Sequence, residues 1–188
     1  MNIGIQGGPG STNEQALGLF SEQLNIKTYA TKYLIHTENV LEALEKGVID
    51  RGVFAWKSSR VGVVEESEKA VPKYKFKVVD SVEIELNHAL FAAPSASIDI
   101  TEPVHIYSHP QALRIHSEYF TKIFPTVTTH SEEDTALAAE KISKGAYPKN
   151  SLAIAPLQCA ERYNLQLVNP YLPGNIDYIT TFWMVERC

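Results

Sequence analysis

A serine and a histidine that precede a predicted helix are the side chains best suited to bind an anion. The apolar run 104–107 predicts a strand, and Ser108, His109, Pro110 and Gln111 follow it directly. Proline is tolerated in the first turn of a helix, because its missing N–H would have no partner there. The pattern therefore places Ser108 just before a helix N-terminus, where backbone N–H groups and the helix dipole attract a carboxylate or phosphate. The alternative is a serine that only caps the helix.

Three further polar loops follow predicted strands: residues 7–11, 57–60 and 134–135. The glycine-rich loop has neither the G-x-G-x-x-G spacing nor the lysine of a P-loop, so a tight turn explains it equally well. Lys57 and Arg60 are equally compatible with an exposed surface pair, and Thr135 with part of a helix cap. Ligands of α/β proteins bind beyond the carboxyl ends of strands, which makes these loops candidates for one shared site.

Two other kinds of site are disfavoured by spacing. His88 and His109 are potential metal ligands, but the chain has no paired His or Cys/His spacing typical of a metal site. It also has no G-x-S-x-G elbow of a serine hydrolase. We therefore expect no metal and no cofactor.

The elements that must position these residues alternate between strand and helix signals. Ser11 with Glu14 forms a capping-box pattern ahead of the first helix. Strands are predicted at 2–6, 26–30, 51–56, 76–85, 88–93, 104–107, 126–129, 151–155, 165–168 and 178–185. Helices are predicted at 15–24, 37–46, 110–123, 134–143 and 156–163. This order predicts an α/β fold with largely parallel sheets covered by helices on both faces.

Composition excludes several classes of partner. A net charge of −5 and a pI of about 5.7 argue against nucleic acid binding. No apolar run approaches the roughly 18 to 20 residues that span a bilayer, and residues 1–5 predict a strand rather than a signal peptide. Cys159 and Cys188 form no disulfide framework, so we expect reduced thiols and a cytoplasmic location.

Six short motifs, taken in order, resemble the catalytic domain of prephenate dehydratases. The most complete match is Ser-His-Pro-Gln-Ala-Leu, and the final strand carries Thr180-Thr181-Phe182 where the family has Thr-Arg-Phe. The matching segments are residues 7–11, 55–62, 108–113, 134–139, 153–165 and 180–182. Together they cover nearly the whole chain.

The resemblance implies a two-lobed fold similar to the type II periplasmic binding proteins, with the site in a cleft between lobes. We expect lobe one at about residues 1–84 plus 169–188, and lobe two at about 85–168. The family usually adds a C-terminal ACT domain that senses phenylalanine. The present sequence stops at Cys188, so feedback regulation within the chain is not expected. A homodimer or homotetramer is implied by the family alone.

The resemblance also implies a reaction, the loss of water and carbon dioxide from prephenate to give phenylpyruvate in phenylalanine biosynthesis. The threonine of Thr-Arg-Phe acts near the leaving hydroxyl in the family, so Thr180 inherits the catalytic role. A donor at that place stabilises charge that develops on the leaving oxygen. The substrate-binding positions that follow from the motifs are Ser11, Lys57, Ser58, Ser59, Ser108, His109, Gln111, Thr135 and Thr181.

Several positions depart from the family pattern. Lys57 and Ser58 stand where the family has Glu-Asn, Thr181 replaces an arginine, Ile115 a glutamine, and Asp134 a serine. We hypothesise that Lys57 replaces the lost arginine as the clamp on a substrate carboxylate, with a point charge instead of a planar fork. Three functions stay open: a prephenate dehydratase, a relative that only decarboxylates prephenate, and a non-catalytic carboxylate-binding module.

Overall fold

The computed structural model describes residues 1–175 and 177–188, and the chain divides into two compact units. The first unit comprises residues 1–86 and 177–188, and the second comprises residues 87–176. The return to the first unit therefore comes later than the position 169 expected from the sequence. Leu172 belongs to the core of the second unit, and Asn175 bonds both backbone groups of His88 through its side chain, at 3.2 and 2.7 Å. These contacts hold residues 169–175 in the second unit.

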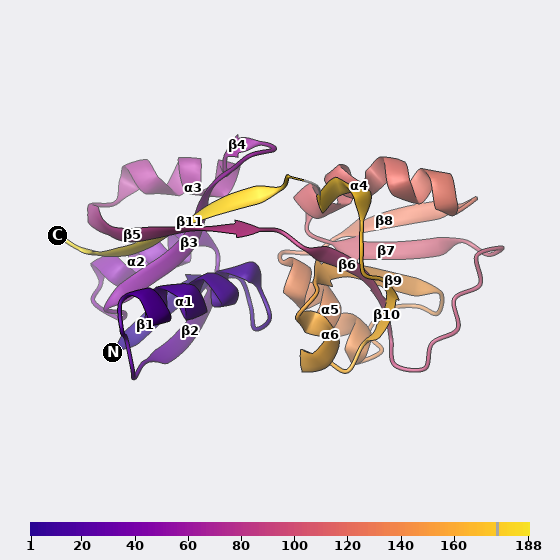
Figure 1. Cartoon of the computed structure of the whole chain (residues 1–188), viewed down its shortest axis with the longest axis horizontal. Helices are drawn as coiled ribbons and strands as arrows, with labels where there is room; N and C mark the ends of the chain where they lie inside the picture. The colour runs from indigo at the N-terminus through magenta and orange to yellow at the C-terminus, as the bar shows by residue number, and fades with distance from the viewer. Residues whose placement is uncertain (176) are drawn as a thin grey trace. The chain divides into compact units, whose positions relative to one another are not determined.

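The first unit is built on a mixed sheet. Its strands, in spatial order, are β2 (Ala30–Ile35), β1 (Asn2–Gln6), β3 (Arg51–Ser58), β11 (Ile179–Arg187) and β5 (Phe76–Glu85), with β4 (Gly62–Val63) paired to β3 (Figure 1). The β1 strand runs parallel to β2 and β3, whereas β11 runs antiparallel to both β3 and β5.

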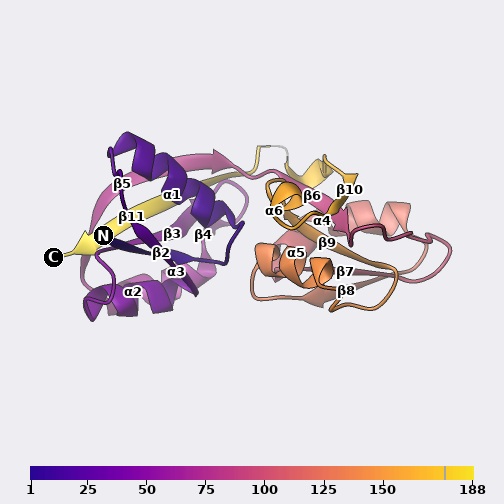
Figure 2. The same cartoon turned by 90° about the horizontal axis from the view of Figure 1, so that it is seen from below.

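Helices cover both faces of this sheet. Helix α1 (Thr12–Gln23) packs Ala16, Leu17 and Phe20 on one face. Helices α2 (Thr37–Glu45) and α3 (Glu65–Ala70) lie on the other face, followed by the short 3-10 helix η1 (Val71–Lys73) (Figure 2). Each face therefore has its own apolar core.

The second unit repeats the plan with a second mixed sheet. Its strands, in spatial order, are β10 (Gln166–Asn169), β6 (His88–Ala92), β9 (Ser151–Pro156), β7 (Val104–Ser108) and β8 (Val127–Ser131). The β7 strand is parallel to β8 and β9, and β6 is antiparallel to β9 and β10. Helix α4 (Pro110–Ile123) covers one face, and α5 (Thr135–Ser143) with α6 (Cys159–Arg162) covers the other. The 3-10 helix η2 (Pro173–Asn175) contacts α4.

Three sequence predictions about these elements are wrong. The helix predicted at 156–163 is only the short α6, because Pro156 still belongs to β9. The sheets are mixed rather than largely parallel, because the long strands β5 and β11 pair directly with each other instead of through a crossover helix. The strand predicted at 26–30 instead begins at Ala30, where its N–H bonds the carbonyl of Met1 and its residues pair with β1. Helix α3 and strand β4 were not predicted, since both are short and carry weak periodicity.

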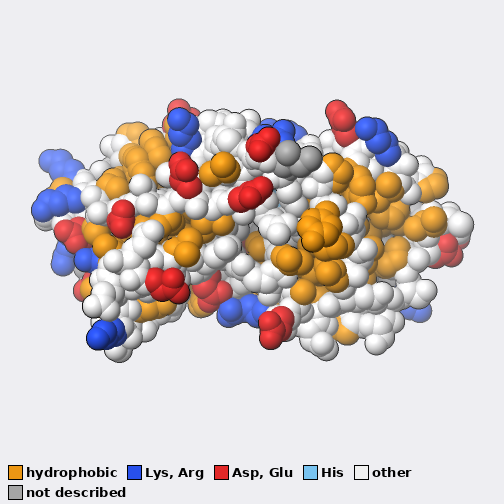
Figure 3. All heavy atoms as spheres, in the orientation of Figure 1, with side chains coloured by type: hydrophobic (Ala, Val, Ile, Leu, Met, Phe, Trp, Pro, Cys, Tyr) orange, Lys and Arg blue, Asp and Glu red, His pale blue; other side chains and the backbone are white. Residues whose placement is uncertain are grey.

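Charged side chains of both signs are interspersed on the face drawn in Figure 3, and apolar side chains gather between them. This distribution accords with a chain of net charge −5. Within residues 1–175 and 177–188, no helix combines the length and the apolarity that crossing a membrane requires.

Candidate active site

Two nearly buried residues with hydroxyl side chains face each other across β3 and β11 in the first unit. Thr180 pairs directly with Ser58, and the two residues are 4% and 3% exposed. Thr180 lies two positions before Phe182, whose side chain packs in the core under α1, so the period of the strand turns Thr180 toward the same side. Among the described residues, the Thr180 hydroxyl has no hydrogen-bond partner. The Ser58 oxygen accepts from the backbone N–H of Val61 at 3.2 Å, which leaves its proton for another acceptor.

Lys57 and Thr181 lie on the opposite face of the sheet from this pair. The two residues are direct cross-strand partners, and the Thr181 hydroxyl lies 3.4 Å from a carboxylate oxygen of Glu83 on β5. Neighbouring residues of a strand point to opposite faces, so neither side chain lies beside Thr180. Lys57 is exposed. The structure thus separates the proposed carboxylate clamp from the proposed catalytic hydroxyl.

Ser11 caps α1 at the edge of the sheet where β1 and β3 end. Its oxygen accepts from the backbone N–H of Glu14 at 3.4 Å. A capping box would also have the Glu14 carboxylate accept from the Ser11 N–H. Here that carboxylate accepts from the Gly10 N–H at 2.7 Å, and the Ser11 N–H bonds the carbonyl of Gly8. One N–H of the glycine loop is therefore already bonded to a carboxylate of the protein. Ser11 lies at the same end of the strands as Ser58 and on the same face of the sheet.

Ser59 has a structural task. Its hydroxyl donates to the Asp177 carbonyl at 2.6 Å and accepts from the Ile179 N–H at 3.0 Å, and its own N–H bonds the Ile179 carbonyl. These three bonds tie the end of β3 to the segment that enters β11. Ser59 therefore holds Ser58 and Thr180 in register.

The strand-to-helix turn of the second unit differs from the expected cap. Ser108 is fully buried, and its hydroxyl donates to the Ile154 carbonyl on β9 at 2.8 Å. The capping residue of α4 is His109, whose Nδ1 accepts from the Gln111 N–H at 3.3 Å. The alternative of a capping role for Ser108 is wrong, because residue 108 still belongs to β7, which pairs with β8 up to that position.

Thr135 is the first residue of α5 and is half-buried, with Asp134 as the capping residue. Helices α4 and α5 begin after the carboxyl ends of β7 and β8, which are adjacent parallel strands. The second unit therefore places Ser108, His109 and Thr135 at one edge of its sheet. Within the part of the chain described here, no cluster of three or more His, Cys, Asp or Glu side chains suits a metal ion.

A buried histidine pair lies close to this turn, and the sequence had pointed to only one of its members. The Nδ1 of His88 lies 3.3 Å from the Nε2 of His116 on α4, and both residues are buried. Burial, with smaller contributions from His116 and His109, lowers the pKa of His88 to about 3. His88 is therefore neutral at pH 7. The sequence did not indicate a role for His116. Its position on α4 follows the spacing of the buried apolar residues, and that spacing does not reveal a polar contact.

The chain has the two-lobed α/β architecture of type II periplasmic-binding-protein-like folds, and each unit corresponds to one lobe. The model of the prephenate dehydratase family matches residues 3–188, and the chain belongs to that family. A curated relative, Arogenate dehydratase 5, chloroplastic, from Arabidopsis thaliana, is 27% identical over the whole chain, which covers 42% of that protein. The chain thus spans about two fifths of the length of the curated relatives it matches.

Two solved structures share the fold. A prephenate dehydratase from Arthrobacter aurescens, solved in complex with L-Phe, superposes with a TM-score of 0.81 at 19% identity, and the match covers the whole chain and 61% of that protein. A protein described as GqqA, a novel type of quorum quenching acylase, gives a TM-score of 0.74 at 22% identity, covering the whole chain and 64% of that protein. The second neighbour shows that the fold by itself does not fix the chemistry.

Proposed function

We propose that this chain is the catalytic part of a dehydratase that acts on prephenate or arogenate. The reaction breaks the bond from the ring to its hydroxyl and the bond to the ring carboxylate, so that hydroxide leaves with a proton as water and carbon dioxide is released. Aromatisation of the ring drives the reaction. The protein has to hold the substrate and stabilise negative charge on the departing oxygen.

The observation that carries the proposal is the Thr180 hydroxyl. It belongs to a nearly buried residue and has no partner among the described residues. Because no described group of the protein bonds this hydroxyl, its proton is available to a bound substrate. In our proposal, Thr180 donates to the leaving oxygen, and Ser58 and Ser11 supply further hydrogen bonds on the same face of the sheet.

The positions of the substituted residues also support a working enzyme. The two departures from the family at Lys57 and Thr181 lie on the face of the sheet opposite Thr180. They therefore remove less from the surroundings of Thr180 than the sequence alone suggested. On the Thr180 face, Thr180 and Ser11 match the family motifs, whereas Ser58 stands where the family has asparagine.

The test is to incubate the purified protein separately with prephenate and with arogenate. Formation of phenylpyruvate from prephenate, or of phenylalanine from arogenate, supports a dehydratase, and the ratio of the two kcat/KM values identifies the substrate. Carbon dioxide release without an aromatic product identifies a decarboxylase. Absence of turnover, combined with tight binding of either acid in calorimetry, contradicts the proposal and identifies a binding module.

A further inference from the structure

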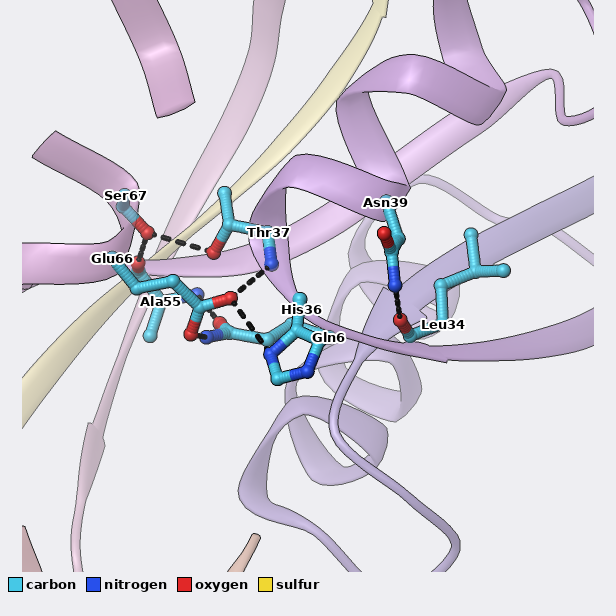
Figure 4. Close-up of polar contacts among 8 residues, drawn as sticks. All are labelled: Gln6, Leu34, His36, Thr37, Asn39, Ala55, Glu66 and Ser67. Carbon is cyan, nitrogen blue, oxygen red and sulfur yellow. Dashed lines mark hydrogen bonds and ion pairs between the residues drawn. The ribbon is translucent and has the colours of Figure 1, made fainter. Parts of the chain in front are cut away.

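A polar network connects four elements of the first unit at the edge of the sheet (Figure 4). The side-chain oxygen of Gln6, the last residue of β1, accepts from the backbone N–H of Ala55 on β3 at 3.0 Å. Its side-chain nitrogen donates to the carboxylate of Glu66 on α3 at 2.8 Å. The other carboxylate oxygen of Glu66 accepts from the backbone N–H of Thr37, the first residue of α2, at 2.6 Å. One amide side chain thus joins β1, β3 and the start of α2.

Ala55 lies where β3 departs from regular pairing. Lys57 pairs with Thr181, but Phe182 pairs with Ala55, so Trp56 is an extra residue opposite β11. An extra residue of this kind is a β-bulge, which bends its strand and changes the direction of the side chains that follow.

The backbone of Ala55 is held by side chains at this bulge. Gln6 accepts from its N–H, and the Ser67 hydroxyl donates to its carbonyl at 2.6 Å. The Ser67 oxygen also lies 3.0 Å from the Thr37 hydroxyl, which closes the network onto α2. The conformation of the bulge therefore depends on side chains from outside the strand.

We propose that Gln6 is a positioning residue, which with Glu66 fixes the bulge so that Ser58 faces Thr180. The assignment of a reaction to that pair rests on the proposed function. The geometric part does not, because it concerns only the path of β3. An uncharged amide suits this place because Gln6 has to accept from an N–H and donate to a carboxylate at the same time.

The bulge carries its own spectroscopic reporter. Trp56 stacks on Trp183 with ring centroids 4.1 Å apart and planes inclined by 17°, and these are the two tryptophans of the chain. Two indoles so close give an exciton couplet in circular dichroism. The couplet reports the position of Trp56 without reference to any activity.

The experiment compares the full chain with three variants. Gln6→Leu removes both bonds of the amide. The double variant Gln6→Glu/Glu66→Gln reverses the pair: the new carboxylate accepts from Ala55 and from the new amide, and that amide accepts from Thr37. Asn39→Leu is the matched control, because Asn39 is exposed and its amide donates to the Leu34 carbonyl at 2.9 Å, outside the network around Ala55. Each protein is measured by circular dichroism, by thermal unfolding, and by kcat and KM for prephenate and arogenate.

We expect Gln6→Leu to lose the tryptophan couplet and to lower kcat at least ten-fold with a smaller change in KM, because a displacement of about 1 Å can cost 10²-fold in rate. The reversed pair should restore both signals to within about three-fold, and Asn39→Leu should leave both unchanged. An unchanged couplet and kcat in Gln6→Leu overturns the proposal. If Gln6→Leu does not fold, a reversed pair that folds without restoring the signals overturns it too. If the wild type turns over neither acid, the proposed function fails while the couplet still decides the role of Gln6.

Discussion

Replacing Thr180 by valine should lower activity and leave stability nearly unchanged. Thr180→Val exchanges the hydroxyl for a methyl group of similar size at a residue that is 4% exposed. The hydroxyl has no partner in the described part of the chain, so its removal breaks no hydrogen bond. The free energy of unfolding should therefore change by less than about 1 kcal/mol. In a chain of this size that corresponds to a change in Tm of less than roughly 2 to 4 °C.

The same change should lower kcat by about 10²- to 10³-fold, the usual loss when one donor to a developing negative charge is removed. Phenylpyruvate or phenylalanine formation gives kcat, and thermal unfolding gives Tm. Thr181→Val is the matched control, because it makes the same exchange one residue along β11 on the opposite face. We expect it to change kcat by less than about three-fold.

Three results would refute this reasoning. A Thr180→Val protein with wild-type kcat would show that its hydroxyl does not touch the reacting group. A loss of stability of about 1 kcal/mol or more would show that the hydroxyl has a structural partner, and a fall in kcat would then have a structural explanation. A large loss in the Thr181→Val control would place the chemistry on the other face of the sheet.

Three further predictions follow from the placement of single side chains. Lys57→Ala should change substrate affinity by less than about three-fold, because Lys57 is exposed on the face opposite Thr180. A ten-fold loss of affinity in a binding titration would instead support Lys57 as the carboxylate clamp. Ser108→Ala should lower the free energy of unfolding by about 1 to 2 kcal/mol, because the Ile154 carbonyl loses its buried donor; urea unfolding measures it, and an unchanged midpoint would contradict the assigned bond. The lowered pKa of His88, about 3 against 6.5, means that the unfolded chain binds more protons between those values. Stability should therefore fall as pH drops from about 6.5 toward 3, by up to about 1.4 kcal/mol per pH unit from this group, and His88→Gln should flatten that dependence in urea unfolding at a series of pH values.

Local patterns were sufficient to predict most of the elements. The strands at Asn2–Gln6 and Phe76–Glu85 and the helix at Pro110–Ile123 have the predicted bounds. Each is specified by its own periodicity and by turn or proline signals at its ends. The family, too, could be recognised from the order of short motifs, because those motifs are contiguous in sequence.

Pairing between distant strands was not available from such patterns. Whether β5 and β11 would pair antiparallel depends on the return of the chain after the second unit, about which neither strand carries a signal. The same applies to the bulge at Trp56, since an extra residue is defined only relative to the partner strand.

The sequence by itself determined which residues carry hydroxyls, charges and apolar periodicity, and therefore the elements, the fold class and the family. Only the tertiary structure decided which of those side chains share a face. It placed Thr180 with Ser58, moved Lys57 and Thr181 to the other side, and used the hydroxyls of Ser59 and Ser108 in backbone hydrogen bonds. The physical reason is that the face of a strand residue is set by register, and register is a property of two strands at once.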